Sequence, residues 1–301
     1  MRDRIDDPVL TDDDVAWLRR MLPATEAGAY LNTGTAGPLP TPAVEAMRDE
    51  IEIQLTLPRS GPEHLDRYLA LAAEDRSAIA SLLHAQPSEI ALTHSTTEGM
   101  SLVTMGIGWR HGDEAVTTNL EHPGVLFPLC VARDRFGVEV RRLDLDGLSD
   151  SDIVEALTAA VSPRTRLVSI SHVSFQNGQV LPIRAIADAI GGDSALLLVD
   201  GAQSYGALDI DVTSLGADAY AVPGQKWQLG PEGTGGLYCR PEIIEDLSVT
   251  MASYGTVESY TATDFVPHRD ARRLEFGTTN TIGWVGQISA ISFLSETVGL
   301  A

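Results

Sequence analysis

Two hydrophobic periods alternate along most of the chain. Short apolar runs predict buried strands, and stretches in which apolar residues recur every three or four positions predict helices. Strands are expected at 89–93, 114–118, 138–141, 167–171, 196–199, 219–221 and 236–239. Helices are expected between them at 96–107, 125–135, 151–160 and 183–190. Because strand and helix take turns, the pattern predicts crossover units on a mostly parallel sheet, with helices on both faces.

The two ends of the chain lie outside this alternation. The stretch Arg2–Met21 contains a short amphipathic segment and predicts a surface helix. A loop rich in Gly and Pro follows at Tyr30–Pro40, and helices are expected from Thr41 onward and at Leu65–His84. The apolar pattern at 282–294 predicts one more helix. We divide the chain into an N-terminal arm (1–29), a large domain (30–285) and the start of a linker helix (286–301).

Composition and charge narrow the class of protein. The chain has 301 residues, an apolar fraction of 44% and a net charge of −21. Nucleic acids and anionic membranes need a basic footprint, so neither is expected as the main partner. Two cysteines exclude a disulfide framework, and no apolar run approaches the length of a membrane span. The charged N-terminus lacks a signal-peptide core, so we expect a cytoplasmic protein.

Polar residues follow several predicted strands at the edge where such sheets bind ligands. Thr96 and Thr97 begin a helix after the first strand, which suits an anion, although the same pattern is typical of an ordinary helix cap. His122 follows the second strand. A histidine there can stack on an aromatic ligand or relay a proton, and it can equally be a loop residue bonded to backbone.

Two more candidates carry charge. Asp200 ends an apolar strand and needs a partner, either a cationic ring nitrogen of a cofactor or an arginine. Lys226 is the one lysine of the central and C-terminal parts of the chain. Its Gly, Trp and apolar neighbours can lower its pKa and make it a nucleophile toward carbonyls, whereas the alternative is a surface lysine after a turn. Phosphate-binding glycine motifs, hydrolase motifs and metal-ligand spacings are absent from the sequence.

The order and spacing of these candidates resemble a known site. Thr96-Thr97, His122, Asp200-x-x-Gln203 and Lys226 together resemble the pyridoxal 5′-phosphate (PLP) site of the class V aminotransferase and cysteine desulfurase family, fold type I. The resemblance runs from about residue 30 to about residue 280. Segments 121–125, 178–182 and 230–233 look most similar to the branch of cysteine/cystine carbon–sulfur lyases. Isopenicillin N epimerase-like enzymes and cysteine desulfurases are similar as well.

The resemblance implies a fold, a cofactor and roles for residues. The fold would be a three-layer α/β large domain with a mixed, mainly parallel sheet, and the small C-terminal domain of the family would be largely absent. Lys226 would bind PLP covalently and then move protons at the substrate α-carbon, and Asp200 would pair with the pyridinium nitrogen. The other implied cofactor contacts come from Gln203 at the ring oxygen, His122 on the ring face, and Thr96, Thr97 and Gln225 at the phosphate. Thr278 would reach the phosphate from a neighbouring subunit, which implies a homodimer with shared active sites.

The sequence also departs from the family pattern. Gln225 stands where the family commonly has His, and Pro223 stands where a hydroxyl residue is frequent, so one phosphate contact is expected to be lost. In the family, the small domain usually carries the arginine that holds the substrate carboxylate and, in desulfurases, the persulfide-forming cysteine. Neither Cys130 nor Cys239 matches that cysteine, and both are predicted to lie in the core.

The expected function is therefore a PLP-dependent reaction on a small amino acid. We expect α,β-elimination at a cysteine- or cystine-like substrate, because the segments resemble the lyase branch and no persulfide cysteine is matched. Desulfuration, epimerisation and transamination are alternatives within the family. A cofactor-binding protein without catalytic activity is the alternative from a different class.

Overall fold

A seven-stranded sheet forms the centre of the computed structural model, which describes residues 10–191 and 195–299. In spatial order its strands are β1 (Ile90–Thr93), β7 (Gly235–Cys239), β6 (Ala219–Pro223), β5 (Leu196–Asp200), β4 (Thr165–Ser171), β2 (Glu114–Thr118) and β3 (Glu139–Leu143). Only β7 is antiparallel to its neighbours. The other six strands are parallel to one another, which confirms the predicted mixed, mainly parallel sheet and all seven expected strands.

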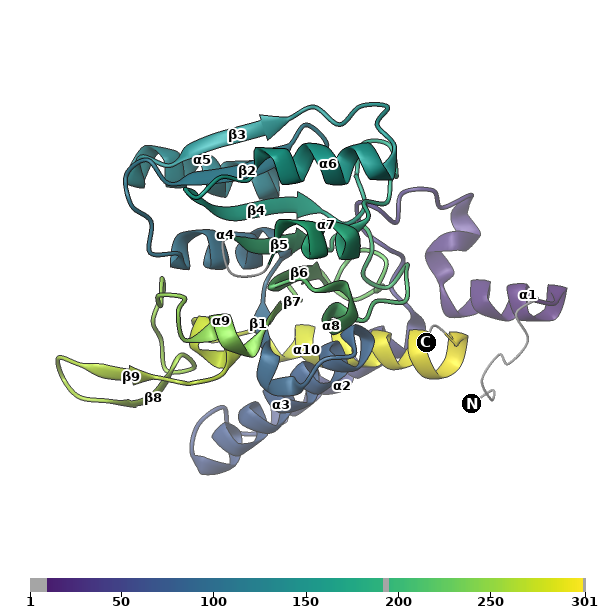
Figure 1. Cartoon of the computed structure of the whole chain (residues 1–301). Coiled ribbons are helices and arrows are strands. Elements are labelled where there is room, and N and C mark those ends of the chain that lie inside the picture. The colour runs from purple at the N-terminus through teal and green to yellow at the C-terminus, as the bar shows by residue number, and fades with distance from the viewer. Residues whose placement is uncertain (1–9, 192–194, 300–301) are drawn as a thin grey trace.

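Helices cover both faces of this sheet and make three layers (Figure 1). One apolar cluster packs α4 (Thr96–Gly106), α5 (Pro123–Phe136) and α9 (Pro241–Ile244) on one face. The other cluster packs α3 (Pro62–Leu83), α6 (Asp150–Ala160), α7 (Ile183–Ile190) and α8 (Val212–Leu215) on the opposite face. Burial on both sides explains why the inner strands β5, β6 and β7 are rich in apolar residues without alternation, whereas the edge strand β3 is largely exposed and carries charged residues.

Local sequence signals set the ends of the helices. Ser149 and Asp152 form a reciprocal capping box at the start of α6. His122 caps α5, which ends at Gly137 with a φ of 74°, a backbone conformation that favours glycine. At α4 the cap is not reciprocal. Ser95 accepts a hydrogen bond from the Glu98 N–H, but the Glu98 carboxylate turns to the backbone N–H and ring of His94.

The two terminal segments come together in a small apolar cluster that also contains Leu229. Helix α10 (Thr281–Ser292) contacts α2 (Thr41–Thr56) and α3, and it continues as one turn of wider helix at Phe293–Val298. Helix α1 (Asp12–Met21) packs Trp17 against Phe293 with 6.2 Å between ring centroids. Residues 1–9 of the expected arm lie outside the described residues. Helix α10 crosses residue 285, so the expected boundary between domain and linker falls inside a continuous helix.

A two-stranded hairpin projects from the body of the molecule (Figure 1). It consists of β8 (Val257–Tyr260) and β9 (Phe265–Pro267), and the sequence pattern gave no expectation for it. Its strands are short and mostly exposed, so they lack the buried apolar run that marks the strands of the central sheet.

Candidate functional site

A cavity of about 430 Å³ opens at the carboxyl edge of the parallel strands. The ends of β1, β2, β5 and β6 converge there, as expected for a parallel α/β sheet. Seven of the eight predicted site residues line it, namely Thr96, Thr97, His122, Asp200, Gln203, Gln225 and Lys226. Residues that are up to 130 positions apart in the sequence therefore share one site.

One end of the cavity offers unpaired donors and acceptors. Thr96 and Thr97 are the first two residues of α4, where backbone N–H groups have no partner within the helix. The Thr96 hydroxyl is buried and has no hydrogen-bond partner among the described residues, and the same holds for the Gln225 side-chain oxygen. Buried polar atoms are normally paired, so the orphaned Thr96 hydroxyl, a donor beside a helix N-terminus, fits an anionic ligand group such as a phosphate. The Gln225 oxygen is an acceptor and needs a donor instead.

His122 lies at the mouth of the cavity as the cap of α5. Its Nδ1 accepts a hydrogen bond of 3.0 Å from the Gly124 N–H, which leaves Nε2 to carry the proton of the neutral ring. Burial, and then the nearby charge of Lys226, lower the pKa of His122. The Phe175 ring meets the imidazole edge-on at 5.1 Å. The imidazole that lines the cavity is thus oriented by Gly124 and Phe175.

Asp200 is a buried carboxyl at the end of β5. Its Oδ1 accepts a hydrogen bond of 2.8 Å from the Ala202 N–H. Burial raises the pKa of Asp200, while that hydrogen bond and the charges of Lys226 and His122 oppose the rise. Among the described residues no arginine pairs with Asp200, so the salt-bridge alternative from the sequence is not realised there. A ligand cation is the partner that this carboxyl lacks.

Lys226 follows β6 and is half-buried. Burial lowers the pKa of Lys226, and the negative charge of Asp200 partly offsets this effect. Lys226 is also the only lysine in the 301-residue sequence. An amine with a lowered pKa that lines a cavity is suited to attack a carbonyl carbon.

The loop between α1 and α2 closes over the Lys226 turn. The Gly37 N–H donates a hydrogen bond of 2.7 Å to the Gln225 carbonyl. A Cβ at Gly37 would lie only 2.3 Å from the Lys226 carbonyl oxygen, so no other residue fits this approach. Gly34 and Thr35 of the same loop line the cavity, and the sequence analysis missed both. Their only sequence signal was the Gly/Pro-rich composition of the loop, which does not say where a loop folds back.

Gln203 bridges that loop and the lysine turn. Its amide nitrogen donates to the Gly34 carbonyl at 3.0 Å, and its amide oxygen accepts from the Trp227 indole N–H at 2.7 Å. The amide of Gln203 thus has fixed partners on both sides while the side chain still lines the cavity.

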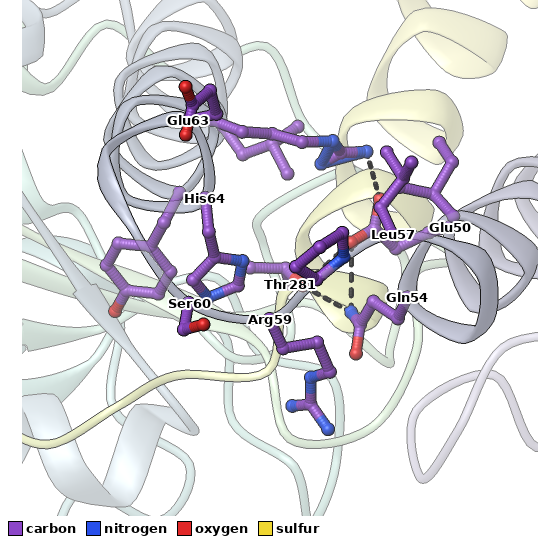
Figure 2. A pocket seen from close by; sticks show the side chains of 13 residues that line it. Glu50, Gln54, Leu57, Arg59, Ser60, Glu63, His64 and Thr281 are labelled. Carbon is purple, nitrogen blue, oxygen red and sulfur yellow. Dashed lines mark hydrogen bonds and ion pairs between the residues drawn. The ribbon is translucent and has the colours of Figure 1, made fainter.

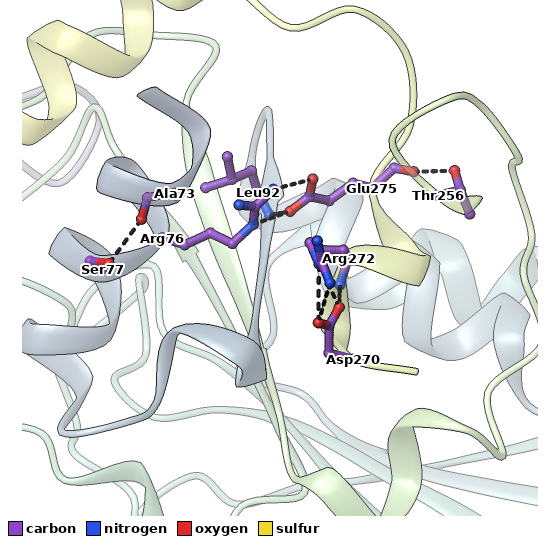
Figure 3. Close-up of polar contacts among 8 residues, drawn as sticks. All are labelled: Ala73, Arg76, Ser77, Leu92, Thr256, Asp270, Arg272 and Glu275. Carbon is purple, nitrogen blue, oxygen red and sulfur yellow. Dashed lines mark hydrogen bonds and ion pairs between the residues drawn. The ribbon is translucent and has the colours of Figure 1, made fainter. Parts of the chain in front are cut away.

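Thr278, the eighth predicted site residue, does not line the cavity within one chain. The segment before it is anchored by Glu275, whose carboxylate accepts two hydrogen bonds from Arg76 and one from the Leu92 N–H (Figure 3). This anchoring ties the segment to α3 and to the outer strand β1. The assignment of Thr278 to a neighbouring subunit's site stays a prediction.

A second cavity of about 380 Å³ lies between α2 and α3 and contains none of the predicted site residues. Figure 2 shows the buried Glu50 carboxylate at its wall, held by Arg67, Gln54 and Thr281. Every oxygen of Glu50 has a protein partner. The buried Glu50 carboxylate is therefore satisfied within the protein, in contrast to the orphaned groups of the first cavity.

Other predictions concern residues and elements away from the site. Cys239 is buried and burial raises its pKa, whereas Cys130 is only half-buried, so the predicted core position is confirmed for Cys239 alone. The part of the chain that the structure describes contains no cluster of side chains suited to a metal ion. Within the same part, no helix is both long enough and apolar enough to cross a membrane.

Comparison with known proteins places the chain in a family. The family model "Aminotransferase class-V" matches residues 29–301. A probable cysteine desulfurase of Methanothermobacter thermautotrophicus is 34% identical over 282 residues, which cover 93% of this chain and 70% of the relative. The isopenicillin N epimerase of Streptomyces clavuligerus is 31% identical over 276 residues, covering 88% of this chain and 69% of that protein.

A solved structure shares the fold. The complex of the cystine C-S lyase C-DES with its reaction product cysteine persulfide is 30% identical, with a TM-score of 0.86 over 91% of this chain and 74% of that one. A variant of C-DES with glycine covalently linked to the PLP cofactor gives a TM-score of 0.87 over 93% and 75%.

The residues of the cavity fit PLP. A helix N-terminus with an orphaned hydroxyl suits its phosphate, a buried carboxyl without an arginine partner suits its ring nitrogen, and a lysine with a lowered pKa suits its aldehyde. The match over 273 residues and the likeness in fold agree with this chemistry. The chain belongs to the class-V aminotransferase family and is a PLP-dependent enzyme.

Proposed function

We propose that the enzyme acts on cysteine or a cystine-like amino acid by α,β-elimination. Both the probable cysteine desulfurase and the cystine C-S lyase that resemble this chain are named for sulfur amino acids. The observation that carries the proposal is the convergence of Lys226, Asp200 and His122 on one cavity. Overall, cystine and water would give cysteine persulfide, pyruvate and ammonia.

The cavity residues have distinct roles in this proposal. PLP, when bound, supplies an electron sink for the pair of electrons left at the substrate α-carbon. Lys226 would hold the cofactor and would take the α-proton of the substrate. Asp200 keeps the ring nitrogen protonated, since a buried carboxylate is stabilised by a cationic partner. His122 covers one face of the ring, and the start of α4 holds the phosphate.

Elimination is the reaction whose requirements the described cavity meets. Desulfuration needs, in addition, a thiol that attacks the substrate sulfur, and neither Cys130 nor Cys239 lines the cavity. Cys239 is buried at the end of β7 with a raised pKa, which makes it a poor nucleophile. Elimination needs only a base at the α-carbon and a leaving group at the β-carbon, and Lys226 provides the base.

The cofactor assignment is tested first, by borohydride reduction of the chain loaded with PLP. Lys226 is the only lysine, so a stable mass increase on the peptide that contains it identifies the covalent bond without ambiguity. Lys226→Ala is expected to show no such adduct and no visible absorbance band. An adduct on the N-terminal amine alone would contradict the assignment.

The reaction is tested by product analysis with cystine and cysteine. Pyruvate and ammonia in equal amounts would support elimination. Alanine with sulfane sulfur would instead indicate a desulfurase, a D-amino acid an epimerase, and a keto acid without ammonia an aminotransferase. A chain that carries PLP on Lys226 but exchanges no α-proton of any amino acid would be a cofactor-binding protein without catalytic activity.

We also propose that the enzyme is a homodimer in which Thr278 reaches the phosphate of the partner's site. Exposed apolar side chains on the molecular surface support an interface, among them Leu55, Leu57, Leu65 and Leu69 around the α2–α3 turn. Sedimentation of the loaded chain is expected to give twice the monomer mass. If the chain sediments as a monomer and still binds PLP fully, this assembly is excluded.

A further inference from the structure

Trp227, the residue after the cofactor lysine, makes one polar contact that the proposed roles leave unexplained. Its indole N–H donates a hydrogen bond of 2.7 Å to the side-chain oxygen of Gln203. The residue is 37% exposed, so it is not held there by full burial in the core. This hydrogen bond joins the residue next to Lys226 to a side chain that lines the cavity, so it can influence how that side chain meets a ligand.

The partners of Gln203 determine which way its amide points. The oxygen and nitrogen of a glutamine amide have nearly the same shape, so only their partners decide the orientation. The Trp227 indole nitrogen can only donate, and the Gly34 carbonyl can only accept. The Gln203 oxygen must therefore face Trp227, and one of its two N–H groups faces Gly34.

One amide N–H of Gln203 remains, and the side chain lines the cavity. We propose that Trp227 is a positioning residue that holds the Gln203 amide so that this N–H, and not the oxygen, faces the ring oxygen of PLP. This inference rests on the proposed function, because it assumes that PLP binds in this cavity. A donor at that point stabilises negative charge on the ring oxygen. An amide oxygen there would instead repel it.

The expected effect is on the protonation, and therefore the visible absorbance, of the bound cofactor, and it can be measured without substrate. A donor to the ring oxygen favours the form of the bound cofactor in which the nitrogen attached to Lys226 has lost its proton. The pH midpoint of the visible absorbance change is therefore lower with the Gln203 donor in place than without it. Loss of the Trp227 N–H frees the amide to turn, although the Gly34 carbonyl still holds its nitrogen, so the effect of Trp227 is partial.

The test compares four PLP-loaded chains by absorbance over a range of pH. Trp227→Phe keeps an aromatic ring and removes the N–H, and we expect it to raise the midpoint by about half a unit. Gln203→Ala removes the donor itself and is expected to raise the midpoint by about one unit. In the Gln203→Ala background, Trp227→Phe is expected to add nothing, because Trp227 acts only through Gln203.

Trp109→Phe is the matched control. Trp109 also donates its indole N–H at 2.7 Å, to the Thr104 carbonyl, and it lies outside the cavity lining. The control is expected to leave the midpoint unchanged. An equal shift from Trp227→Phe with and without Gln203 would overturn the proposal, since Trp227 would then act on Lys226 directly. An unshifted midpoint in Trp227→Phe would also overturn it while leaving the proposed function intact. Absence of any lysine-dependent band in the unmodified chain would overturn both.

Discussion

The hydroxyl of Ser171 donates a hydrogen bond of 2.6 Å to the buried carboxyl of Glu121. Ser171 ends β4 and lies opposite Asp200 in the register of β4 with β5. Glu121 directly precedes His122, and Thr118 donates a second hydrogen bond of 2.6 Å to its other oxygen. The loop that carries His122 is thereby fixed to the same strand ends that carry Asp200.

The first prediction concerns the contribution of Glu121 to the pH dependence of the stability of the fold. Burial raises the pKa of Glu121 to about 7, the hydroxyls of Ser171 and Thr118 oppose the rise, and the charge of Asp200 adds to it. A carboxyl whose pKa is raised by folding stabilises the fold fully below its unfolded pKa, and this contribution is lost as pH rises toward 7. The glutamine of Glu121→Gln does not titrate. The free energy of unfolding of this variant, relative to that of the unmodified chain, should therefore increase by about 3 kcal/mol between pH 4.5 and 7.

Urea unfolding at pH 5, 6, 7 and 8 measures this difference. Glu155→Gln on the exposed face of α6 is the control and should follow the unmodified chain at every pH. If Glu121→Gln shows the same pH dependence as the control, then Glu121 is not forced to ionise inside the fold.

Removal of the unpaired Thr96 hydroxyl is expected to have opposite effects on the stability of the chain and on its affinity for PLP. Thr96→Val replaces the hydroxyl by a methyl group of the same shape. Without PLP it should stabilise the chain by about 1 kcal/mol, because a buried unpaired polar atom is removed. With PLP it should weaken cofactor binding about tenfold, because the phosphate loses a charge-assisted hydrogen bond.

Thr117→Val provides the comparison, since the Thr117 hydroxyl is also buried and unpaired but does not line the cavity. It should stabilise the chain and leave PLP affinity unchanged. Fluorescence titration with PLP and urea unfolding measure the two quantities. Equal PLP affinity in Thr96→Val and the unmodified chain would remove Thr96 from the phosphate site.

Gly37 tests how closely its loop approaches the lysine turn. A Cβ there would meet the Lys226 carbonyl and the Leu229 side chain at 2.3 and 2.5 Å, so Gly37→Ala must push the loop away from the turn. We expect about a tenfold loss of PLP affinity, the effect of roughly 1.4 kcal/mol of strain at the site. Gly108→Ala is the control, because nothing lies within 4 Å of a Cβ at that position. Unchanged PLP affinity in Gly37→Ala would mean that the loop does not constrain Lys226.

Glu275 tests the anchor of the segment that leads to Thr278. Its side chain is 13% exposed, and so is that of its partner Arg76. Glu275→Gln leaves the Arg76 charge buried without compensation and should cost about 3 kcal/mol of stability. Asp270→Asn, which alters the more exposed pair with Arg272 in the same view (Figure 3), should cost less than about 1 kcal/mol. Urea unfolding of both variants at pH 7 tests the ranking, and equal costs would contradict it.

The sequence by itself determined the elements of the central sheet and which residues stand at its strand ends. A buried strand and an amphipathic helix differ in hydrophobic period, and period is a local property of the chain. The carboxyl ends of parallel strands share one edge, so Thr96, His122, Asp200 and Lys226 were predicted to meet before any distance was known.

Tertiary structure decided the rest. The insertion of antiparallel β7 between β1 and β6, the fold-back of Gly34 and Gly37, and the orientation of Gln203 all depend on contacts between segments far apart in sequence. Hydrogen bonds such as that of Trp227 to Gln203 and packing limits such as that at Gly37 arise only when those segments come together. No periodicity encodes them, because a loop's composition permits many paths and only the surfaces it meets select one.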